Sequence, residues 1–417
     1  MPKEKIITAI DVGSSKVSTI IAGLTENKIS VIGVSGNVPS KGIKKGNVVD
    51  IDDAVQAISN SLERAERMAG VSVSSAFVTI NGSHLETLNS HGVVAVSHSG
   101  SEISTEDVAR VTEAAQAVTL PSSREIIHVI PRDFMVDGQD GIRDPVGMSG
   151  IRLEVETNNI HGSSTAMRNL AKCVEQVGVE VEDMVYVGVA GSEAVLTDTE
   201  KELGCLLVDI GGGTTSVIAF SEGSPVYSDV LPIGGKHITS DLAIGLRAHM
   251  EASESIKIKL SEEREGFNTI EHDNMNDDFD VSGFGLDMDS VPRKLLYGIM
   301  DARLNEIFSL IALEIKKADL TGKLPAGVIL TGGSSLTSGI ERVAKRVLKT
   351  PVRIGYPKGV TGLIDEIEGP AFAATVGEVI YGAQLIKSGS LLSFDSGRGK
   401  IGNILSKILE KAKSFLP

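Results

Sequence analysis

The chain has 417 residues, of which 41% are hydrophobic and 23% are charged, and its formal net charge is −15. This length suggests two or more domains, and the acidic balance argues against a general nucleic-acid binder, because clustered lysines and arginines must meet a phosphate backbone. No apolar run is long enough to span a bilayer, no signal-peptide core precedes the first strand, and Cys173 and Cys205 show no zinc or disulfide spacing, which favours a reducing cytoplasm.

The first segment alternates apolar strands with one helix. Residues 6–12 ("IITAIDV") predict a strand that delivers Asp11 to a turn. That turn consists of Gly13, Ser14, Ser15 and Lys16. Glycine and small hydroxyl residues after a strand can expose backbone N–H groups to a phosphate. Residues 52–69 then predict a helix in which the side chain of Asp52 or Asp53 accepts hydrogen bonds from the N–H groups of the first turn.

From residue 83 to residue 161 the pattern changes to short strands around one helix, which predicts a small α+β insertion. Ser104 is the expected N-terminal cap of that helix. Residues 162–189 then return to the first fold, with a helix over 164–177 and a strand over 184–190 ("MVYVGVA"). Residues 191–199 predict the start of a connecting helix that carries Glu193, an acid that would favour a helix N-terminus.

A second acid-led hairpin repeats the plan of the first. In "LLVDIGGGTT" an apolar strand ends at Asp209. Gly211, Gly212, Gly213, Thr214 and Thr215 follow it. We expect the three glycines to adopt positive φ and to cradle a phosphate. A third turn, "VILTGGSS", has Gly332, Gly333 and Ser334 but no acid, which is typical of the nucleoside end of such a site.

Two further pairs follow the second hairpin. Gly235 and Lys236 start a helix, where free N–H groups can bind an anion. Glu254 and Lys257 are one helical turn apart and point the same way; a surface ion pair is the simplest alternative.

The stretch over 261–292 is acidic and predicts a solvated loop with short strands. Its spacing does not fit a calcium loop. Residues 292–318 predict a long, core-facing helix, because apolar residues recur at i, i+3 and i+4.

The last 31 residues predict a linker and an amphipathic helix. Residues 387–399 are rich in serine and glycine. Residues 400–417 place Ile401, Ile404, Leu405, Ile408, Leu409, Phe415 and Leu416 on one stripe, with Lys407 and Lys411 beside the other face. Such a helix suits a membrane interface with anionic lipid. Docking on the protein's own body is the alternative.

Together these motifs resemble the phosphate-1, phosphate-2 and adenosine motifs of the actin, heat-shock-70 and sugar-kinase superfamily. Longer stretches resemble the FtsA family of bacterial actin homologues, in matching order and spacing from about Ile6 to Gln384. They are "HVIPRDFMVDGQDGIRDPVGMSGIRLE", "GVAGSEAVLT", "ELGCLLVDIGGGTTSV", "LPIGGKHITSDLA" and "VILTGGSSLTSGI".

The resemblance implies an α/β, actin-like (ribonuclease-H-like) two-domain ATPase fold with inserted subdomains and a C-terminal amphipathic helix. The implied divisions are 1–82 (subdomain 1A), 83–161 (inserted subdomain 1C), 162–203 (1A), 204–227 (2A), 228–300 (2B), 301–358 (2A), 359–386 (return to 1A), 387–399 (linker) and 400–417 (membrane-targeting helix).

The resemblance also implies an ATP and Mg²⁺ site. Asp11 and Asp209 would position Mg²⁺ through water, since Mg²⁺ keeps much of its hydration shell. The glycine and hydroxyl residues of the two hairpins would hold the phosphates with Lys16, while Gly332, Gly333, Ser334, Glu254 and Lys257 would line adenosine with Gly235 and Lys236 near the nucleotide. The family's Ala-Glu-x-x-Lys stretch departs here, because Ser253 and Ser255 flank the glutamate. Glu193 matches a polar position near the attacking water.

The function that the resemblance implies is a cell-division scaffold, at most a slow ATPase. It would tether FtsZ to the cytoplasmic side of the cell membrane at the division site and self-associate into filaments with ATP. Arg303, Asn305 and Glu306 would contact the FtsZ C-terminal peptide, and subdomain 1C other division proteins. A small-molecule kinase of the same superfamily and a pilus-assembly actin-like protein are the alternatives.

Overall fold

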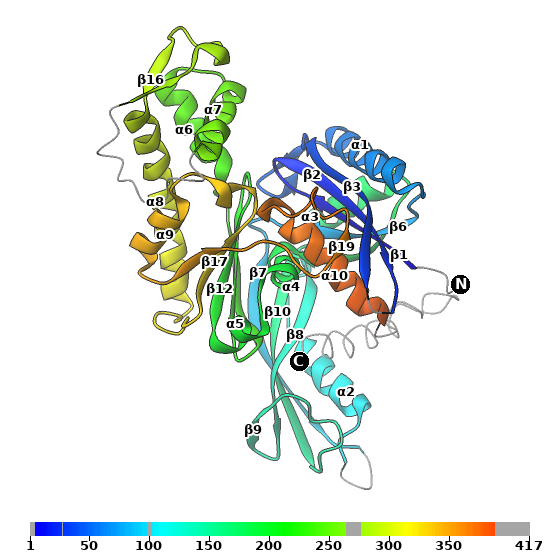
Figure 1. Cartoon of the computed structure of the whole chain (residues 1–417). Coiled ribbons are helices and arrows are strands. Elements are labelled where there is room, and N and C mark those ends of the chain that lie inside the picture. The colour runs from blue at the N-terminus through cyan, green and yellow to red at the C-terminus, as the bar shows by residue number, and fades with distance from the viewer. Residues whose placement is uncertain (1–4, 27, 98–101, 264–276, 388–417) are drawn as a thin grey trace.

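The computed structural model describes residues 5–26, 28–97, 102–263 and 277–387. Three main sheets organise these residues into two lobes and one inserted subdomain (Figure 1). The predicted linker and tail helix lie outside the described residues, as do residues 264–276 of the acidic loop. No described helix has the length and apolar character needed to cross a bilayer.

Lobe 1 is built on a sheet of strand order β11-β6-β1-β2-β3-β19. Its strands are β1 (Lys5–Val12), β2 (Lys16–Leu24), β3 (Ile29–Pro39), β6 (Ser75–Ile80), β11 (Glu180–Tyr186) and β19 (Thr361–Gly362). β1, β2 and β3 form an antiparallel meander, whereas β6 pairs parallel with both β1 and β11. The carboxyl ends of these three parallel strands therefore meet at one edge of the sheet.

Helix α1 (Ile51–Ala69) contacts β3 and β2 of this sheet, and Gly70 ends it in the left-handed conformation. The N-terminal cap is Asp50, whose side chain accepts from Asp53 N at 3.0 Å. The prediction of Asp52 or Asp53 was wrong because the helix begins earlier, and both of those acids lie inside its first turn. A short hairpin of β4 (Ile43–Lys44) and β5 (Asn47–Val48) precedes α1.

Lobe 2 repeats the plan in the order β14-β13-β12-β17-β18. Its strands are β12 (Cys205–Ile210), β13 (Thr215–Ser221), β14 (Ser224–Leu231), β17 (Gly327–Thr331) and β18 (Val352–Ile354). Again an antiparallel meander is followed by parallel strands. The first strand of each lobe thus has an aspartate, Asp11 or Asp209, as its next-to-last residue, at the same topological position.

The inserted subdomain is a sheet of order β7-β10-β8-β9 with α2 (Thr105–Gln116) packed on it. The strands are β7 (Glu86–Ala95), β8 (Arg124–Val136), β9 (Gln139–Ile142) and β10 (Arg152–Ser163). Ser104 caps α2 as predicted, in a capping box with Asp107. The subdomain also contacts lobe 2, since Thr87 Oγ1 donates to Ser228 O at 2.8 Å.

Two helices of lobe 1, α4 (Val187–Val195) and α10 (Ala373–Lys387), pack against each other and α4 also contacts β12 and β13 of lobe 2. The predicted strand over 184–190 stops at Tyr186, and its last residues open α4 instead. The apolar run looks like a strand, but its small residues allow close helix packing: a Cβ on Gly377 of α10 would lie 1.7 Å from Ala190 O. α3 (Ser164–Glu175) and α5 (Asp198–Leu203) flank this region.

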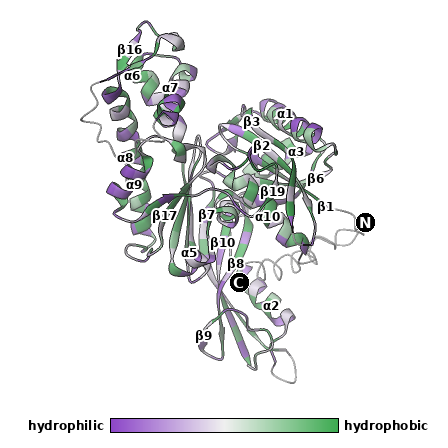
Figure 2. Ribbon diagram, in the orientation of Figure 1, coloured by the Kyte–Doolittle hydropathy of each residue, from purple (hydrophilic) through white to green (hydrophobic). Residues whose placement is uncertain are grey.

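The upper part of lobe 2 is mainly helical (Figure 1). It contains α6 (Gly235–Leu246), α7 (Met250–Glu262), β15 (Asp278–Asp280), the 3-10 turn η2 (Ser282–Phe284), β16 (Ser290–Pro292) and α8 (Arg293–Lys317). The 3-10 turn η3 (Gly333–Leu336) is followed by α9 (Ile340–Leu348), and η4 (Pro370–Phe372) precedes α10. The implied divisions at 227/228 and 300/301 fall inside β14 and α8. Hydrophobic and hydrophilic residues alternate along these helices (Figure 2), and the buried hydrophobic residues form one core between them.

Candidate nucleotide-binding cleft

A cleft of about 880 Å³ lies between the lobes, at the carboxyl ends of β1, β6, β12 and β17. Both predicted acids and most predicted glycine and hydroxyl residues line it. They are Asp11, Gly13, Ser14, Ser15, Lys16, Asp209, Gly211, Gly212, Thr214, Gly235, Lys236, Glu254, Lys257, Gly332, Gly333 and Ser334. Gly213 and Thr215 are not among the lining residues. Thr215 Oγ1 donates to Ile233 O at 2.8 Å, which ties the second hairpin to the segment before α6.

The two hairpins touch each other across the cleft. A Cβ on Gly212 would lie 2.6 Å from Ser15 Cβ, and one on Gly213 would lie 2.9 Å from Ser14 Cβ. Positive φ was wrongly predicted for Gly211, Gly212 and Gly213, none of which adopts it. For Gly212 and Gly213 the requirement is space for the opposing hairpin rather than an unusual backbone angle.

Asp209 and Asp11 are the acids at the floor of the cleft. Burial, reinforced by the charge of Asp11, raises the pKa of Asp209 to about 7, while Lys16 acts in the opposite direction. Burial also raises the pKa of Asp11, opposed by a 2.6 Å hydrogen bond from Thr79 and by Lys16. The pair is therefore short of positive charge when the cleft holds only protein groups.

The positive charge of Lys16 lowers the pKa of both acids. Its Nζ is buried, has no hydrogen-bond partner, and lies 3.8 Å from the centroid of the Phe372 ring. Burial lowers the pKa of this lysine, against the charges of Asp11 and Asp209. An unsatisfied buried ammonium beside glycine hairpins fits a phosphate, which would supply the missing acceptors.

The described residues contain no group of three or more His, Cys, Asp or Glu side chains placed to hold a metal ion. Asp11 and Asp209 alone would be an incomplete ligand set. They fit Mg²⁺, which characteristically binds through one or two carboxylates together with water and phosphate oxygens.

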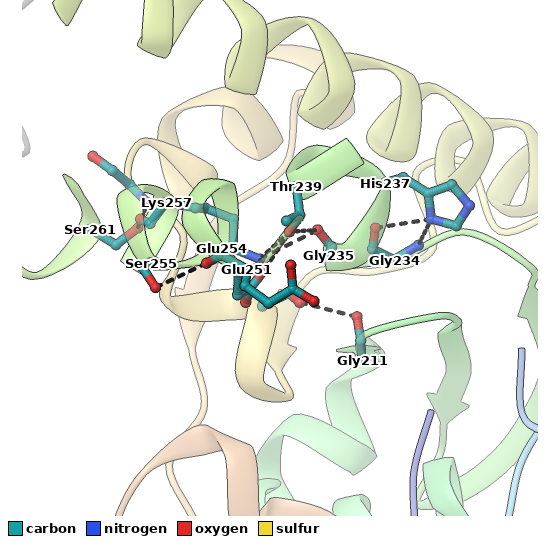
Figure 3. Close-up of polar contacts among 12 residues, drawn as sticks. Gly211, Gly234, Gly235, His237, Thr239, Glu251, Glu254, Ser255, Lys257 and Ser261 are labelled. Carbon is teal, nitrogen blue, oxygen red and sulfur yellow. Dashed lines mark hydrogen bonds and ion pairs between the residues drawn. The ribbon is translucent and has the colours of Figure 1, made fainter. Parts of the chain in front are cut away.

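At the nucleoside end, Glu254 and Lys257 belong to a network with Thr239 (Figure 3). Lys257 and Thr239 are buried, and the Glu254 side chain is 42% exposed. Lys257 Nζ donates to Glu254 Oε2 at 2.7 Å and to Thr239 Oγ1 at 3.0 Å, and Thr239 donates to the same carboxylate. The pair is therefore more than a surface ion pair and ties α7 to α6. Ser255 Oγ donates to Glu251 O on the exposed side of α7, so this departure from the family pattern leaves the Glu–Lys pair intact.

Gly332 closes the nucleoside end against the acids. It adopts φ +81°, and a Cβ there would meet Asp209 Oδ1 at 2.6 Å and Ile210 O at 2.7 Å. Ser334 Oγ donates to Gly211 O at 3.0 Å, which joins the third turn to the second hairpin.

The first turn of α6 is not an open anion site. Gly235 N donates to Gly211 O at 2.9 Å and Lys236 N donates to Gly212 O at 2.8 Å. The expectation of free N–H groups there was wrong, because the second hairpin folds back and accepts from them. The Lys236 side chain nevertheless lines the cleft.

Asn81 is a cleft residue that the sequence analysis missed. It follows β6, and its amide joins the lobes: Nδ2 donates to Thr214 Oγ1 at 3.1 Å, and Oδ1 accepts from Ser216 Oγ at 2.9 Å. The available signal was its position, a polar residue directly after an apolar strand parallel to β1.

Glu193 is not brought to the cleft. It lies in the last turn of α4, where Oε1 pairs with Lys201 Nζ at 2.9 Å and Oε2 accepts from Gln384 Nε2 at 2.9 Å. The prediction that Glu193 interacts with a helix N-terminus is also wrong, because the helix begins at Val187 and Glu193 lies in its last turn.

Arg303, Asn305 and Glu306 lie together on α8, outside the cleft lining. Arg303 makes a two-pronged contact with Asp241 of α6, with Nε at 2.6 Å and Nη2 at 2.7 Å from the carboxylate oxygens, and it also pairs with Glu306. Asn305 donates to Asp301 O and accepts from Arg346. Arg303 is therefore held in place by α6 instead of extending freely into solvent.

Comparisons with known proteins agree with this architecture. Residues 82–161 match the family model "SHS2 domain inserted in FTSA", and residues 206–377 match "Cell division protein FtsA". The protein named cell division protein FtsA of Pseudomonas aeruginosa is 36% identical over 421 residues, covering 99% of this chain and 97% of the relative. Its namesake in Bacillus subtilis is 39% identical over 358 residues, covering 86% and 80%.

Solved structures share the fold at low identity. The PilM-PilN type IV pilus biogenesis complex gives a TM-score of 0.63 at 15% identity, covering 90% of this chain and 98% of that one. MreB5 of Spiroplasma citri bound to ADP gives 0.54 at 14% identity, covering 93% and 99%. The predicted actin-like fold class is thereby confirmed.

Proposed function

The chain belongs to the FtsA family of bacterial cell-division proteins, and from this premise we propose that it is an ATP-binding scaffold that links FtsZ to the membrane. The observation that carries the proposal is the cleft, where two glycine hairpins, two acids and an unsatisfied lysine converge. The structural likeness to an ADP-bound MreB5 supports a nucleotide as the occupant.

In this proposal each group of cleft residues has its own task. Lys16 and the hairpin N–H and hydroxyl groups bind phosphates. Asp11 and Asp209 would hold Mg²⁺ through water, and the ion would supply positive charge to the cleft. Thr79 holds Asp11 by its hydrogen bond. Glu254 and Lys257 position the nucleoside end through α6 and α7.

Binding of a fluorescent ATP analogue with Mg²⁺ tests the nucleotide site. Asp209→Ala and the isosteric Asp209→Asn should both abolish binding, because each removes one of the two carboxylates. Asp319→Ala, which changes an exposed loop acid paired with Lys323, is the matched control. Unchanged affinity in both Asp209 variants would remove the proposed site.

For the FtsZ peptide we propose the surface of α6 and α8 around Arg303. Apolar side chains are exposed on both helices: Ile244 of α6, three residues after Asp241, is 75% exposed, and Leu295 of α8, about two turns before Arg303, is 49% exposed. An arginine fixed by Asp241 beside apolar contacts suits a peptide with an acidic group and apolar anchors.

Fluorescence anisotropy with the FtsZ C-terminal peptide tests this surface. Arg303→Glu should weaken binding at least about tenfold, the effect of losing one charge-assisted hydrogen bond. Arg168→Glu, at a 75% exposed arginine paired with Glu125, should have no effect. Equal affinities in the two variants would remove Arg303 from the peptide site.

For the membrane we propose residues 400–417, which lie outside the described part of the chain. Vesicles of zwitterionic lipid with and without anionic lipid should float the full chain only when anionic lipid is present, and a chain stopped at Gly399 should not float. Added FtsZ should float only with the full chain and not with the chain stopped at Gly399. Flotation of the truncated chain would refute membrane attachment through the tail and place it elsewhere.

This arrangement also implies a peripheral location at the cytoplasmic face of the division site, ATP-linked filaments, and contacts of other division proteins with the inserted subdomain. A head-to-tail contact that does not close on itself generates such filaments. A small-molecule kinase would turn over ATP when an acceptor is added, so a phosphorylation screen separates that alternative from the scaffold.

A further inference from the structure

The side chain of Lys236 crosses the mouth of the cleft. It starts from the first turn of α6 in lobe 2, and its Nζ donates to Ser14 O of the first hairpin in lobe 1 at 2.7 Å. These residues are 222 positions apart in the sequence. The bond therefore joins the two lobes directly in front of the phosphate hairpins.

The backbone at both ends of this bond is fixed. On the lobe 2 side, Lys236 N donates to Gly212 O at 2.8 Å, so the lysine and the second hairpin move together. On the lobe 1 side, Ser14 Oγ accepts from Gly46 N at 2.9 Å. Breaking the Lys236–Ser14 bond thus separates one anchored hairpin from the other.

Asn81 makes the opposite connection at the floor of the cleft, reaching from lobe 1 to Thr214 and Ser216 of lobe 2. Lys236 is exposed whereas Asn81 is half-buried, so the Lys236–Ser14 bond is the one of these two bonds that lies nearer to solvent, beside the contact of Gly212 with Ser15. We call Lys236 and Ser14 the mouth contact.

The neighbouring lysines have different surroundings. Lys257 Nζ is occupied by Glu254 and Thr239, and Lys16 Nζ is buried without an acceptor. Lys236 already has an acceptor in the other lobe, and its side chain is exposed at the rim. Lys16 is therefore the ammonium that needs a phosphate, whereas Lys236 is satisfied by closure of the lobes.

We propose that Lys236 is a positioning residue that governs how fast nucleotide leaves the cleft, by holding the mouth closed through Ser14 O. This inference rests on the proposed nucleotide site. It assigns the rate of nucleotide release to a hydrogen bond between the two lobes of the chain. ATP and ADP should be retained alike, because the bond does not involve the γ-phosphate.

Stopped-flow release of fluorescent ADP and ATP analogues from the full chain tests the proposal. Lys236→Met should speed release of both about five- to tenfold, as expected for loss of one partly exposed charge-assisted hydrogen bond. Lys236→Arg should restore slow release, since it keeps a donor of similar reach. Lys323→Met, at an exposed lysine paired with Asp319, is the control and should match the parent chain.

A second readout needs no nucleotide. In the nucleotide-free chain, Lys236→Met should speed amide hydrogen exchange at Gly46 and Ser40, whose N–H groups bond Ser14 Oγ and Ser15 O. Exchange in α1 should stay unchanged, which shows that the fold is intact. Unchanged exchange at Gly46 and Ser40, or release accelerated for ATP but not ADP, would overturn the proposal.

The two proposals fail in different ways. If the parent chain binds no nucleotide, the proposed function fails while the exchange experiment still tests the mouth contact. If the parent chain binds nucleotide but Lys236→Met releases it at the parent rate, only the role of Lys236 is refuted.

Discussion

Glu378 offers the sharpest test of the electrostatics beneath the cleft. It lies on α10, one turn after the cleft residue Ala374, and its side chain is 0% exposed. Neither carboxyl oxygen has a hydrogen-bond partner. Burial, with a contribution from the charge of Asp11, raises the pKa of Glu378 well above its ordinary value of 4.5. Burial therefore favours the neutral form of this carboxyl in the folded chain.

The sign of the pH effect follows from this raised pKa. Below pH 4.5 the carboxyl is protonated in both states and adds no pH dependence. Above it, the unfolded chain releases the proton while the folded chain keeps it, so stability falls as the pH rises towards the folded pKa. The free energy of unfolding should decline by about 1.4 kcal/mol per pH unit from this group alone.

Glu378→Gln removes the titration while keeping the size of the side chain. Relative to the parent chain, the variant should gain stability as the pH rises above 5, by up to about 1.4 kcal/mol in the free energy of unfolding for each pH unit over which the folded parent chain keeps the proton. The measurement is urea denaturation followed by circular dichroism at several pH values, without nucleotide and with magnesium chelated. Asp11 and Asp209 titrate in both chains, so their contributions cancel in the difference.

Glu368→Gln is the matched control, because Glu368 is exposed just before the same helix. Its stability difference from the parent chain should stay flat over this pH range. If the Glu378→Gln curve runs parallel to the parent curve between pH 5 and pH 7, the carboxyl is not held neutral and the reasoning from its burial is wrong.

Three further substitutions probe the cleft and its supports. Gly212→Ala should weaken Mg·ATP binding about tenfold, because the new Cβ would meet Ser15 Cβ at 2.6 Å. Gly298→Ala, in open space on α8, is the control and should leave the affinity unchanged. Equal affinities in the two variants would contradict the contact between the hairpins. Lys16→Met should weaken phosphate-dependent binding by about ten- to a hundredfold while leaving adenosine binding unchanged, as titration with ATP and adenosine would show. Arg353→Lys should lower the denaturation midpoint, because Arg353 Nε and Nη2 contact both Glu200 oxygens at 2.7 and 2.8 Å and lysine cannot; an unchanged midpoint would count against this pair.

Much of the fold could be predicted because the informative signals are local. Both acid-led hairpins, the Ser104 cap and the long α8 are encoded in short runs of sequence. The cleft followed from them, since parallel strands bring their carboxyl ends to one edge of a sheet. Asp11 and Asp209 needed only their strands to be recognised.

The errors arise where local pattern and tertiary contact compete. The run over 187–190 has strand-like apolar residues, yet it forms a helix because α10 packs on its small side chains. The hairpin glycines look like positive-φ positions, but Gly212 and Gly213 leave room for the other hairpin. Glu193 fitted a position in a motif, and its partners Lys201 and Gln384 place it elsewhere.

The bonds that join the lobes were beyond local reasoning. Asn81 meets Thr214 across 133 positions, and Lys236 meets Ser14 across 222. The periodicity or spacing of residues within one segment cannot predict a contact between two segments that are far apart in the sequence. Such contacts depend on how the lobes pack, and they are also the contacts through which an occupant of the cleft would be sensed.

The repeated plan of the lobes has an electrostatic consequence. In each lobe the next-to-last residue of the first strand is an aspartate, but only the first hairpin is followed by a lysine, Lys16. One ammonium cannot neutralise two buried carboxylates, so Asp209, which lacks the Thr79 bond that supports Asp11, has its pKa raised to about 7. Near neutral pH the cleft therefore binds a proton that added positive charge would displace. The unequal surroundings of two equivalent residues thus make the floor of the cleft complementary to a cation, while Lys16 above it is complementary to an anion.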